Sequence, residues 1–383
     1  MQINYGESFK VGVLGAGQLG RMLAQVSPNY DVKIYAMDAS ENAPAAQIVH
    51  QFVAGDIKNF DEVYSFGKDK DVLTVEIEHV NTDALIKLEQ EGVKVFPKPN
   101  NLKLIQDKGL QKEFYEKINV PTAPFRLISS REELNKHKDF LPFFQKLRTG
   151  GYDGKGVFNV QSESNFENAL EGESLLEKYV DFEIELSLIV ARNESQEVVF
   201  YPLVACEFNK KLNLVEFLYS PANVSQELSK KAEEIGRKIV EGLDFIGLLA
   251  IELFLTKDGE LLVNEIAPRT HNSGHHTIEA NFTSQFEQHL RAICNFPLGN
   301  TDLRTSGVMI NLIGEENHLG APFYEGLHEV MKMKGVYPHI YGKSLTKPGR
   351  KMGHVTVVDE HIDKAKLKAR EVQRILKVKS QSK

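Results

Sequence analysis

Two glutamates, Glu252 and Glu265, lie on apolar runs at 250–255 and 261–266 that flank the dipeptide Asp-Gly at 258–259. Asp-Gly between two apolar runs is typical of a two-residue β-hairpin turn, and such a turn would place Glu252 directly opposite Glu265. Facing carboxylates about 5 Å apart repel by about 3 kcal/mol at an effective dielectric of about 20. The pair therefore requires a cation, and two carboxylates suit Mg²⁺, which takes its other ligands from water and substrate phosphates.

The alternative for this stretch is a solvent-exposed hairpin whose two acids face water. The surrounding residues argue against it, because polar and cationic side chains crowd beside the acids where a simple hairpin needs none. These side chains are Asn264, Arg269, His271, Asn272, His275 and His276. We therefore predict a metal site at Glu252 and Glu265.

A second candidate site is the stretch 149–156, TGGYDGKG, which holds four glycines in eight positions. It follows a half-buried strand pattern at 143–148 and predicts a mobile hairpin lid whose backbone N–H groups fold over a polyphosphate. It lacks the G-x-x-x-x-G-K-[ST] pattern of a P-loop. Lys146 lies on the strand beneath the lid, where its ammonium can reach a phosphate. A flexible hairpin with a structural role is the alternative.

A third candidate is the stretch 15–20, GAGQLG, which follows a Val-rich strand pattern and precedes a helical one. With Asp38 at the end of the next strand, it resembles the dinucleotide fingerprint, in which a helix N-terminus holds phosphate and an acid holds a ribose. Ligands of open α/β sheets bind beyond the carboxyl ends of the strands, so Gln18, Glu76 and Glu78 could face the same crevice. Solvated acids are the alternative for Glu76 and Glu78.

A basic cluster lies on glycine-punctuated loops near the C-terminus. Lys343, Arg350, Lys351 and His354 together suit an anion such as a phosphate monoester. A solvated basic loop is the alternative reading of this segment.

Two further positions carry weaker signals. Between a strand pattern at 174–180 and the strand that follows, exposed backbone could bind the edge of an adenine, with Glu185 available to a ribose. Lys108 lies on a helix predicted at 103–118 and, taken alone, would simply face solvent.

The elements that position these residues change character along the chain. Strand and helix patterns alternate from 10 to 96, which predicts an open parallel α/β sheet. Antiparallel strand patterns at 183–190 and 197–203 and an amphipathic helix at 225–243 then precede the acidic hairpin. The chain should therefore combine an α/β part with an α+β part.

Composition limits the class of protein. The 383 residues suffice for two or three domains, and 42% hydrophobic with 26% charged residues is typical of a globular protein. A net charge of −7 argues against a general nucleic-acid binder. Two cysteines without metal-site spacing favour the reducing cytoplasm, and no apolar run is long enough for a signal peptide or a membrane span.

Four motifs in this order resemble the ATP-grasp superfamily and, within it, the N5-carboxyaminoimidazole ribonucleotide synthase family. They are GAGQLGRM at 15–22, RTGGYDGKG at 148–156, NEIAPRTHNSGHHT at 264–277 and GRKMGHVT at 349–356. The resemblance extends from end to end. It implies a Rossmann-like domain at 1–105, a small lid domain at 106–182, and a larger domain with an antiparallel sheet at 183–383.

The resemblance also implies an activity. The family joins bicarbonate to the amine of 5-aminoimidazole ribonucleotide, with ATP and Mg²⁺, through carboxyphosphate, and releases ADP and phosphate. It further implies a homodimer, with neither nucleic acid nor membrane as a partner. Metal charge neutralisation, lysines on the leaving group and a lid that excludes water are what such chemistry requires.

Site residues carry over from the resemblance by position. Glu252 and Glu265 would hold Mg²⁺. The implied nucleotide contacts are Lys108, Lys146, Gly151, Tyr152, Asp153, Gly154, Lys155, Gly156, Glu177, Lys178, Tyr179, Val180, Glu185, Asn264 and Glu265. The implied substrate contacts are Gln18, Leu19, Glu76, Tyr152, His271, Lys343 and Arg350, and the implied catalytic residues are Asp153, Arg269 and Lys343.

The sequence departs from the family pattern at three positions. Ala205 and Phe208 stand where an acid and a histidine are expected after the Tyr-Pro dipeptide at 201–202, so a nucleotide contact from that histidine is lost. Thr270 stands where proline is common, a change of small expected effect.

Three other functions compete with this interpretation. An NAD-dependent dehydrogenase would explain the stretch 15–20 and Asp38, but not the lid, the facing acids or the basic cluster. A nucleotide sensor without catalysis should lack Glu252 or Glu265, and both are present. Another ATP-grasp carboxylate–amine ligase is the alternative within the superfamily, and the motif at 349–356 favours the synthase.

Overall fold

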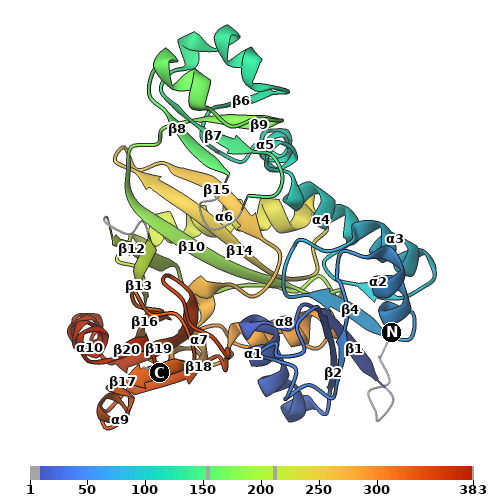
Figure 1. The fold of residues 1–383 in the computed structure, drawn as a ribbon, viewed down its shortest axis with the longest axis vertical. Helices are drawn as coiled ribbons and strands as arrows, with labels where there is room; N and C mark the ends of the chain where they lie inside the picture. Colours follow the sequence, from blue (N-terminus) through green and yellow to red (C-terminus); the bar gives the residue numbers. More distant parts are fainter. Residues whose placement is uncertain (1–8, 152–155, 210–213, 382–383) are drawn as a thin grey trace.

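The computed structural model describes residues 9–151, 156–209 and 214–381. Within these ranges the chain forms three lobes that meet at a common centre (Figure 1). The described strands form a five-stranded, a four-stranded, a nine-stranded and a two-stranded sheet. No helix in the described ranges is long and apolar enough to cross a membrane.

The first lobe is the predicted open parallel sheet, with strand order β3-β2-β1-β4-β5. Its apolar strands are buried on both faces, as parallel strands require. Leu19 and Leu23 of α1 pack on one face, and Phe66 of α2 and Leu85 of α3 pack on the other. The elements are β1 (Lys10–Leu14), α1 (Gln18–Val26), β2 (Lys33–Asp38), β3 (Gln51–Ala54), α2 (Phe60–Gly67), β4 (Val72–Val75), α3 (Thr82–Gln90) and β5 (Lys94–Val95).

The second lobe is a small antiparallel sheet of strand order β6-β9-β7-β8, at the top of Figure 1. Its core includes Phe140, Phe143 and Leu176. A short 3-10 helix (Glu163–Asn168) precedes β9. The strands are β6 (Phe125–Ile128), β7 (Phe143–Leu147), β8 (Val157–Val160) and β9 (Ser174–Lys178).

The third lobe is built on the nine-stranded sheet, of order β15-β14-β10-β12-β13-β16-β19-β18 with β11 beside β10. Residues from α6, such as Ile235 and Ile239, join its main core. The strands are β10 (Phe182–Arg192), β11 (Val198–Phe200), β12 (Val204–Asn209), β13 (Leu214–Ser220), β14 (Gly247–Thr256), β15 (Leu261–Ala267), β16 (Ser306–Ile313), β18 (Val336–Ile340) and β19 (Lys351–Asp359). The helices are α6 (Gln226–Gly242), α7 (Thr277–Ala280), α8 (Gln285–Ile293), α9 (Leu327–Val330) and α10 (Ile362–Ile375).

The described C-terminal end is a strand. α10 ends at Ile375, and the chain continues as β20 (Lys377–Ser380). This strand pairs antiparallel with β17 (Pro322–Glu325), which lies far from it in sequence.

The connection between the first two lobes differs from its prediction. The helix expected at 103–118 is two helices, α4 (Pro99–Gln106) and α5 (Lys108–Lys117). The break occurs at Asp107, whose carboxylate accepts hydrogen bonds from the backbone N–H groups of Gly109 and Leu110. An aspartate at this position caps the new helix and ends the preceding one.

The first and third lobes share a hydrophobic contact. Phe286, Leu290 and Ile293 of α8 belong to the same buried cluster as Leu19 and Leu23 of α1. The crevice at the carboxyl ends of β1 and β4 is therefore held close to the segment that follows β15.

Candidate active site

Glu252 of β14 lies opposite Glu265 of β15, as predicted. The turn between them is not the predicted two-residue turn, because Thr256 N–H bonds to the Glu260 carbonyl and leaves three residues in the loop. Gly259, with φ of 81°, supplies the left-handed residue of this loop. A register shift beyond Leu253 inserts Asn264 as an extra residue, and this bulge restores the pairing of the two glutamates.

Burial and like charges dominate the surroundings of Glu252, and Lys351 and Arg269 offset them only in part. Burial and the nearby carboxylates of Glu265 and Glu185 raise the pKa of Glu252 well above its ordinary value. His271 Nε2 lies 3.5 Å from Glu252, but burial, with Arg269 and Lys351 nearby, lowers the pKa of His271 to about 3. A neutral imidazole cannot offset the repulsion, so the donor set fits a bound cation.

Glu185 of β10 completes the acidic surroundings. Burial and the charge of Glu265 raise its pKa to about 7, although Lys146 opposes the shift. Among the described residues, no group of three or more His, Cys, Asp or Glu side chains could hold a metal by itself. Such an incomplete protein ligand set suits Mg²⁺, which keeps waters and phosphate oxygens as ligands.

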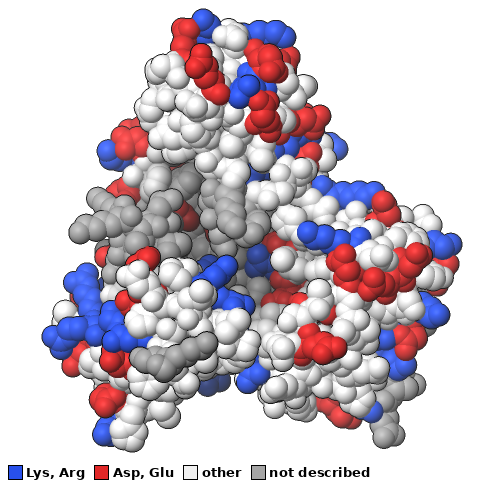
Figure 2. Space-filling view, in the orientation of Figure 1, with Lys and Arg blue, Asp and Glu red and all other residues white. Residues whose placement is uncertain are grey.

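The predicted phosphate-binding lysines meet one of the two predicted metal ligands, Glu265, around one small cavity. Lys108, Lys146, Asn264 and Glu265 all line it. Lys146 Nζ lies 3.5 Å from the Asn264 side-chain oxygen, so it reaches across from the small sheet to the large one. Figure 2 shows the face of the molecule hollowed where the three lobes meet, with acidic and basic atoms inside the hollow.

Glu177 of β9 lies between two lysines. Its carboxylate oxygens lie 2.5 Å from Lys112 Nζ and 2.5 Å from Lys146 Nζ, and only 4% of its side chain is exposed. Burial opposes its charged form, but the two lysines outweigh burial and hold its pKa below the ordinary value. The Glu177 side chain is thus paired with two lysines, and no sequence pattern predicted that Lys112 is buried.

The other residues of the predicted adenine segment point their side chains into the small lobe. Lys178 Nζ donates to the Leu141 carbonyl at 3.1 Å, and the Tyr179 ring packs on Phe144 with centroids 4.3 Å apart. Val180 is half-buried just beyond the end of β9. A nucleotide base would therefore contact the main chain here rather than these polar side chains.

The glycine lid is described only at its base. Tyr152, Asp153, Gly154 and Lys155 lie outside the described residues, whereas Gly151 and Gly156 lie within them. β7 and β8 on either side pair antiparallel, which confirms the predicted hairpin. Arg148 Nε and Nη2 bond to the two carboxylate oxygens of Asp107, at 2.9 and 2.7 Å, and this contact fixes the lid base to the start of α5 and Lys108.

The glycine turn at 15–20 holds carboxylates of the protein itself. Glu76 accepts the backbone N–H of Gly17 at 2.5 Å and of Leu19 at 3.0 Å, and burial raises its pKa despite these bonds. Asp38, expected on a ribose, accepts the N–H of Ala16 at 3.0 Å. The donors that would hold a dinucleotide phosphate are occupied, which argues against the dehydrogenase. Gln18 and Leu19 begin α1 beside Glu76, so these three predicted substrate contacts do lie together.

Arg269 connects the acidic hairpin to the first lobe. Its Nε lies 2.8 Å from the Glu78 carboxylate, just beyond β4, and its Nη1 donates to the Thr270 carbonyl. Thr270, at the position where the family often has proline, is buried. The predicted strand-end acid Glu78 is therefore paired rather than solvated.

The basic cluster lies on the β18–β19 connection. Lys343 Nζ donates to the Lys351 carbonyl at 2.7 Å, and Arg350 Nη1 donates to the Leu345 carbonyl at 2.7 Å. Lys351 is close enough to Glu252 to oppose the rise of its pKa. The cluster thus borders the acidic pair.

His354 lies in a stack of histidines that the sequence did not predict. Its ring lies 4.4 Å from that of His339 and 4.7 Å from that of His275. Burial, with the neighbouring histidines, lowers the pKa of His354 well below the ordinary value, so the His354 ring is neutral and serves packing.

Ala205 is buried on β12, at the position where the family has an acid. The backbone of Phe208 pairs with Val215, and its side chain lies outside the description.

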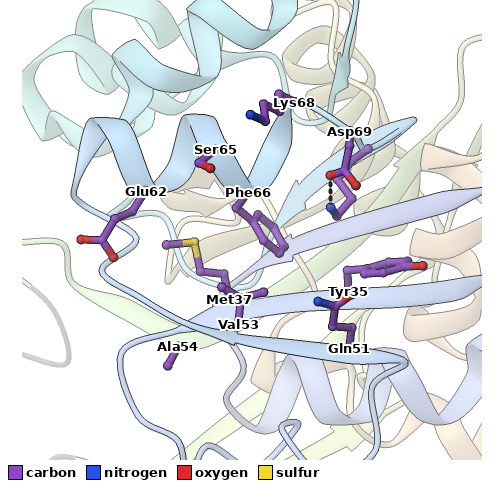
Figure 3. Close-up of a pocket in the computed structure, with 11 residues that line it drawn as sticks. Tyr35, Met37, Gln51, Val53, Ala54, Glu62, Ser65, Phe66, Lys68 and Asp69 are labelled. Carbon is purple, nitrogen blue, oxygen red and sulfur yellow. Dashed lines mark hydrogen bonds and ion pairs between the residues drawn. The ribbon is translucent and has the colours of Figure 1, made fainter.

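A larger hollow lies elsewhere, on the outer face of the parallel sheet beside α2 (Figure 3). Tyr35, Met37 and Phe66 form its apolar floor, and Lys70 at its rim pairs with Asp69. It contains none of the predicted site residues.

Three protein-family models match successive segments that together cover most of the chain. Residues 9–106 match the ribonucleotide synthetase preATP-grasp domain, and residues 113–286 match the ATP-grasp domain. Residues 307–368 match the phosphoribosylaminoimidazole carboxylase C-terminal domain. The fold and site thus define the class of ATP-grasp proteins.

Proteins of similar sequence and structure identify the family within the ATP-grasp class. The N5-carboxyaminoimidazole ribonucleotide synthase of Bacillus subtilis is 36% identical, over 92% of each chain. The crystal structure of the Thermotoga maritima synthetase of the same name is 42% identical with a TM-score of 0.90, covering 97% of this chain and 100% of that one. The chain belongs to the N5-carboxyaminoimidazole ribonucleotide synthase family.

Two further comparisons bear on length and ligands. The chain spans only 64% of the phosphoribosylaminoimidazole carboxylase of Vigna aconitifolia, to which it is 39% identical over 91% of its own length. A synthase from Aspergillus clavatus, crystallised with ADP and 5-aminoimidazole ribonucleotide, is 34% identical with a TM-score of 0.87, covering 96% of this chain and 98% of that one.

Proposed function

We propose that this chain is an ATP-dependent ligase that carboxylates 5-aminoimidazole ribonucleotide with bicarbonate, a step of purine biosynthesis. One observation carries the proposal: Lys146 of the small sheet reaches Asn264, next to the facing acids Glu252 and Glu265. Family membership and the ligands named for the Aspergillus clavatus synthase support the same conclusion.

Glu252 and Glu265 would hold Mg²⁺, which would supply neutralisation of the charge on the phosphates. A bicarbonate oxygen attacks the γ-phosphorus of ATP, and the bond to ADP breaks, which gives carboxyphosphate. Lys146 and Lys108 hold the phosphates in line and stabilise the charge that develops on ADP. The lid at 149–156 excludes water from the labile anhydride.

In the second step the amine of 5-aminoimidazole ribonucleotide attacks the carboxyl carbon of carboxyphosphate. A new C–N bond forms, phosphate leaves, and the amine loses a proton. We assign the orientation of the amine to Asp153, and stabilisation of the carboxyl group to Arg269 and Lys343. Gln18, Leu19 and Glu76 would hold the ribonucleotide in the first lobe.

Other assignments complete the proposal. His271 and Arg350 would contact the ribonucleotide, and the main chain at 177–180 would contact adenine, with Glu185 on the ribose. The domains would be 1–105, 106–182 and 183–383, and the assembly a homodimer. The compartment would be the cytoplasm, where the buried thiols of Cys206 and Cys294 stay reduced.

Incorporation of carbon from labelled bicarbonate tests the reaction. With Mg-ATP and 5-aminoimidazole ribonucleotide, label should appear in an acid-labile carbamate on the ribonucleotide, and omission of ATP should abolish it. Label that enters without ATP, or that never enters, would contradict the proposal.

A further inference from the structure

Lys112 is a buried ammonium in the middle of α5, and 3% of its side chain is exposed. Three oxygen atoms surround its Nζ: Glu177 at 2.5 Å, the Thr122 hydroxyl at 2.5 Å and the Val263 carbonyl at 3.5 Å. An ammonium has three N–H donors, so these contacts occupy all of them. Lys112 therefore has no donor left for a substrate phosphate, although it lines the same cavity as Lys146.

Lys146 is placed differently. Its side chain is 18% exposed, and it pairs with the other oxygen of Glu177 at 2.5 Å. Its contact with Asn264 is long, at 3.5 Å. Of the two lysines that pair with Glu177, Lys146 is thus the one that can turn towards a phosphate, provided that the Glu177 carboxylate does not neutralise it fully.

Glu177 is shared, and this sharing determines the charge of the group. Two lysines and one carboxylate leave a net charge of +1 in a region of low dielectric, where charges interact strongly. Without Lys112, Glu177 and Lys146 would form a neutral pair. Lys146 would then have to give up the carboxylate with which it pairs before it could bind a phosphate.

We propose that Lys112 is a positioning residue for ATP: it binds one oxygen of Glu177 and thereby leaves the charge of Lys146 available to the nucleotide phosphates. Lys112 also joins the small sheet to β15, because it contacts both Glu177 of β9 and the Thr122 hydroxyl. That hydroxyl donates to the Val263 carbonyl at 2.7 Å, one residue before Asn264. The inference rests on the proposed function for the identity of the nucleotide, ATP. It does not depend on the binding of 5-aminoimidazole ribonucleotide.

The test is the affinity of Mg-ATP, measured by calorimetry without ribonucleotide or bicarbonate. Lys112→Met should weaken it by about tenfold or more, the size of one charge-assisted contact. Lys117→Met, at an exposed lysine of the same helix, is the matched control and should bind as the wild type does. The KM for ATP should rise with the loss of affinity.

A second variant separates charge from structure. Lys112→Met combined with Glu177→Gln removes one positive and one negative charge and restores the net +1 at Lys146. This double variant should bind Mg-ATP within about threefold of the wild type, a rescue that the loss of a purely structural contact would not show. Because the double variant leaves no buried carboxylate that has lost its Lys112 partner, it decides the question even where Lys112→Met alone does not fold.

Wild-type affinity in a folded Lys112→Met variant would overturn the inference, and so would a double variant that binds more than about tenfold more weakly than the wild type. A wild-type protein that binds Mg-ATP but does not carboxylate the ribonucleotide would contradict the proposed function and leave this inference intact.

Discussion

Glu252 and Glu265 face each other across β14 and β15 because two irregularities of the hairpin cancel: a three-residue loop shifts the register by one position, and the bulge at Asn264 shifts it back. Glu252 is partly buried and Glu265 is exposed, and like charges that face each other directly across two strands are destabilising without a counter-ion. The hairpin preserves this costly arrangement, which is the expected behaviour of a metal site and not of a scaffold.

The first prediction concerns the acidic pair. Glu265→Gln should lower turnover by about a hundredfold or more, because it removes one of the two charged ligands proposed for Mg²⁺. The fold should remain, since the substitution relieves repulsion. Glu260→Gln, at an exposed position of the same hairpin, is the control. ATP-dependent turnover and a thermal melt measure the two effects, and a fully active Glu265→Gln protein would refute the metal assignment.

The second prediction concerns pH. The raised pKa of Glu185, about 7, means that the folded protein binds a proton between about pH 4.5 and pH 7 that the unfolded chain has released. This contribution to stability is complete below the unfolded pKa and is lost as the pH rises through the folded one. Without ligands, the melting temperature should therefore fall from about pH 5 to pH 8, and Glu185→Gln should flatten this decline.

Metal binding should show the opposite dependence on pH. Mg²⁺ needs ionised carboxylates, so the stabilisation by Mg-ATP should grow from pH 6 to pH 8 as the proton leaves Glu185. Thermal melts at a series of pH values, with and without Mg-ATP, test this. A rise in melting temperature with Mg-ATP that is independent of pH would contradict the placement of the nucleotide and metal at these acids.

The third prediction concerns the glycine turn. A methyl group at Gly17 would lie 2.4 Å from Glu76 Oε1, so Gly17→Ala must displace a carboxylate that binds two backbone N–H groups. The free energy of unfolding should fall by about 1–3 kcal/mol. Gly20→Ala, whose methyl group would come no closer than 3.3 Å to a neighbour, should cost less in the same urea titration. Equal losses would show that the Glu76 contact is unimportant.

The same turn distinguishes nucleotides. Glu76 and Asp38 occupy the N–H groups that a dinucleotide phosphate would need. NAD should therefore leave the melting temperature unchanged, whereas Mg-ATP should raise it. A shift with NAD alone would restore the dehydrogenase hypothesis.

The fourth prediction concerns the break between α4 and α5. Asp107 caps α5 and binds Arg148 through both oxygens, so Asp107→Ala should lower the free energy of unfolding by about 1–3 kcal/mol. It should also raise the KM for ATP, because it loosens Lys108 and the base of the lid. Glu113→Ala, exposed on the same helix, should change neither quantity. An unchanged KM would contradict the role of the lid base.

The features that the sequence could predict depend on local patterns. Alternating strands and helices gave the parallel sheet, and the Asp-Gly dipeptide gave the pairing of Glu252 with Glu265 although its turn type was wrong. The local pattern gave a wrong prediction at Asp107. Apolar periodicity continues from α4 into α5, but the Asp107 side chain caps α5 and separates the two helices.

The features that could not be predicted depend on contacts between distant segments. Glu76 reaches the turn at 15–20 across the sheet, and β20 finds its partner in β17. Lys112 resembles any helical lysine until Glu177 and Thr122 are placed around it. Such contacts carry no periodic signal in a single sequence.

The central claim is that the chain couples ATP cleavage to carboxylation of 5-aminoimidazole ribonucleotide. The most direct test is release of phosphate from Mg-ATP and bicarbonate, measured with and without this ribonucleotide. The account predicts release that depends on the ribonucleotide and is nearly absent in Glu265→Gln. Release at the same rate without the ribonucleotide, or no release with all substrates present, would contradict it.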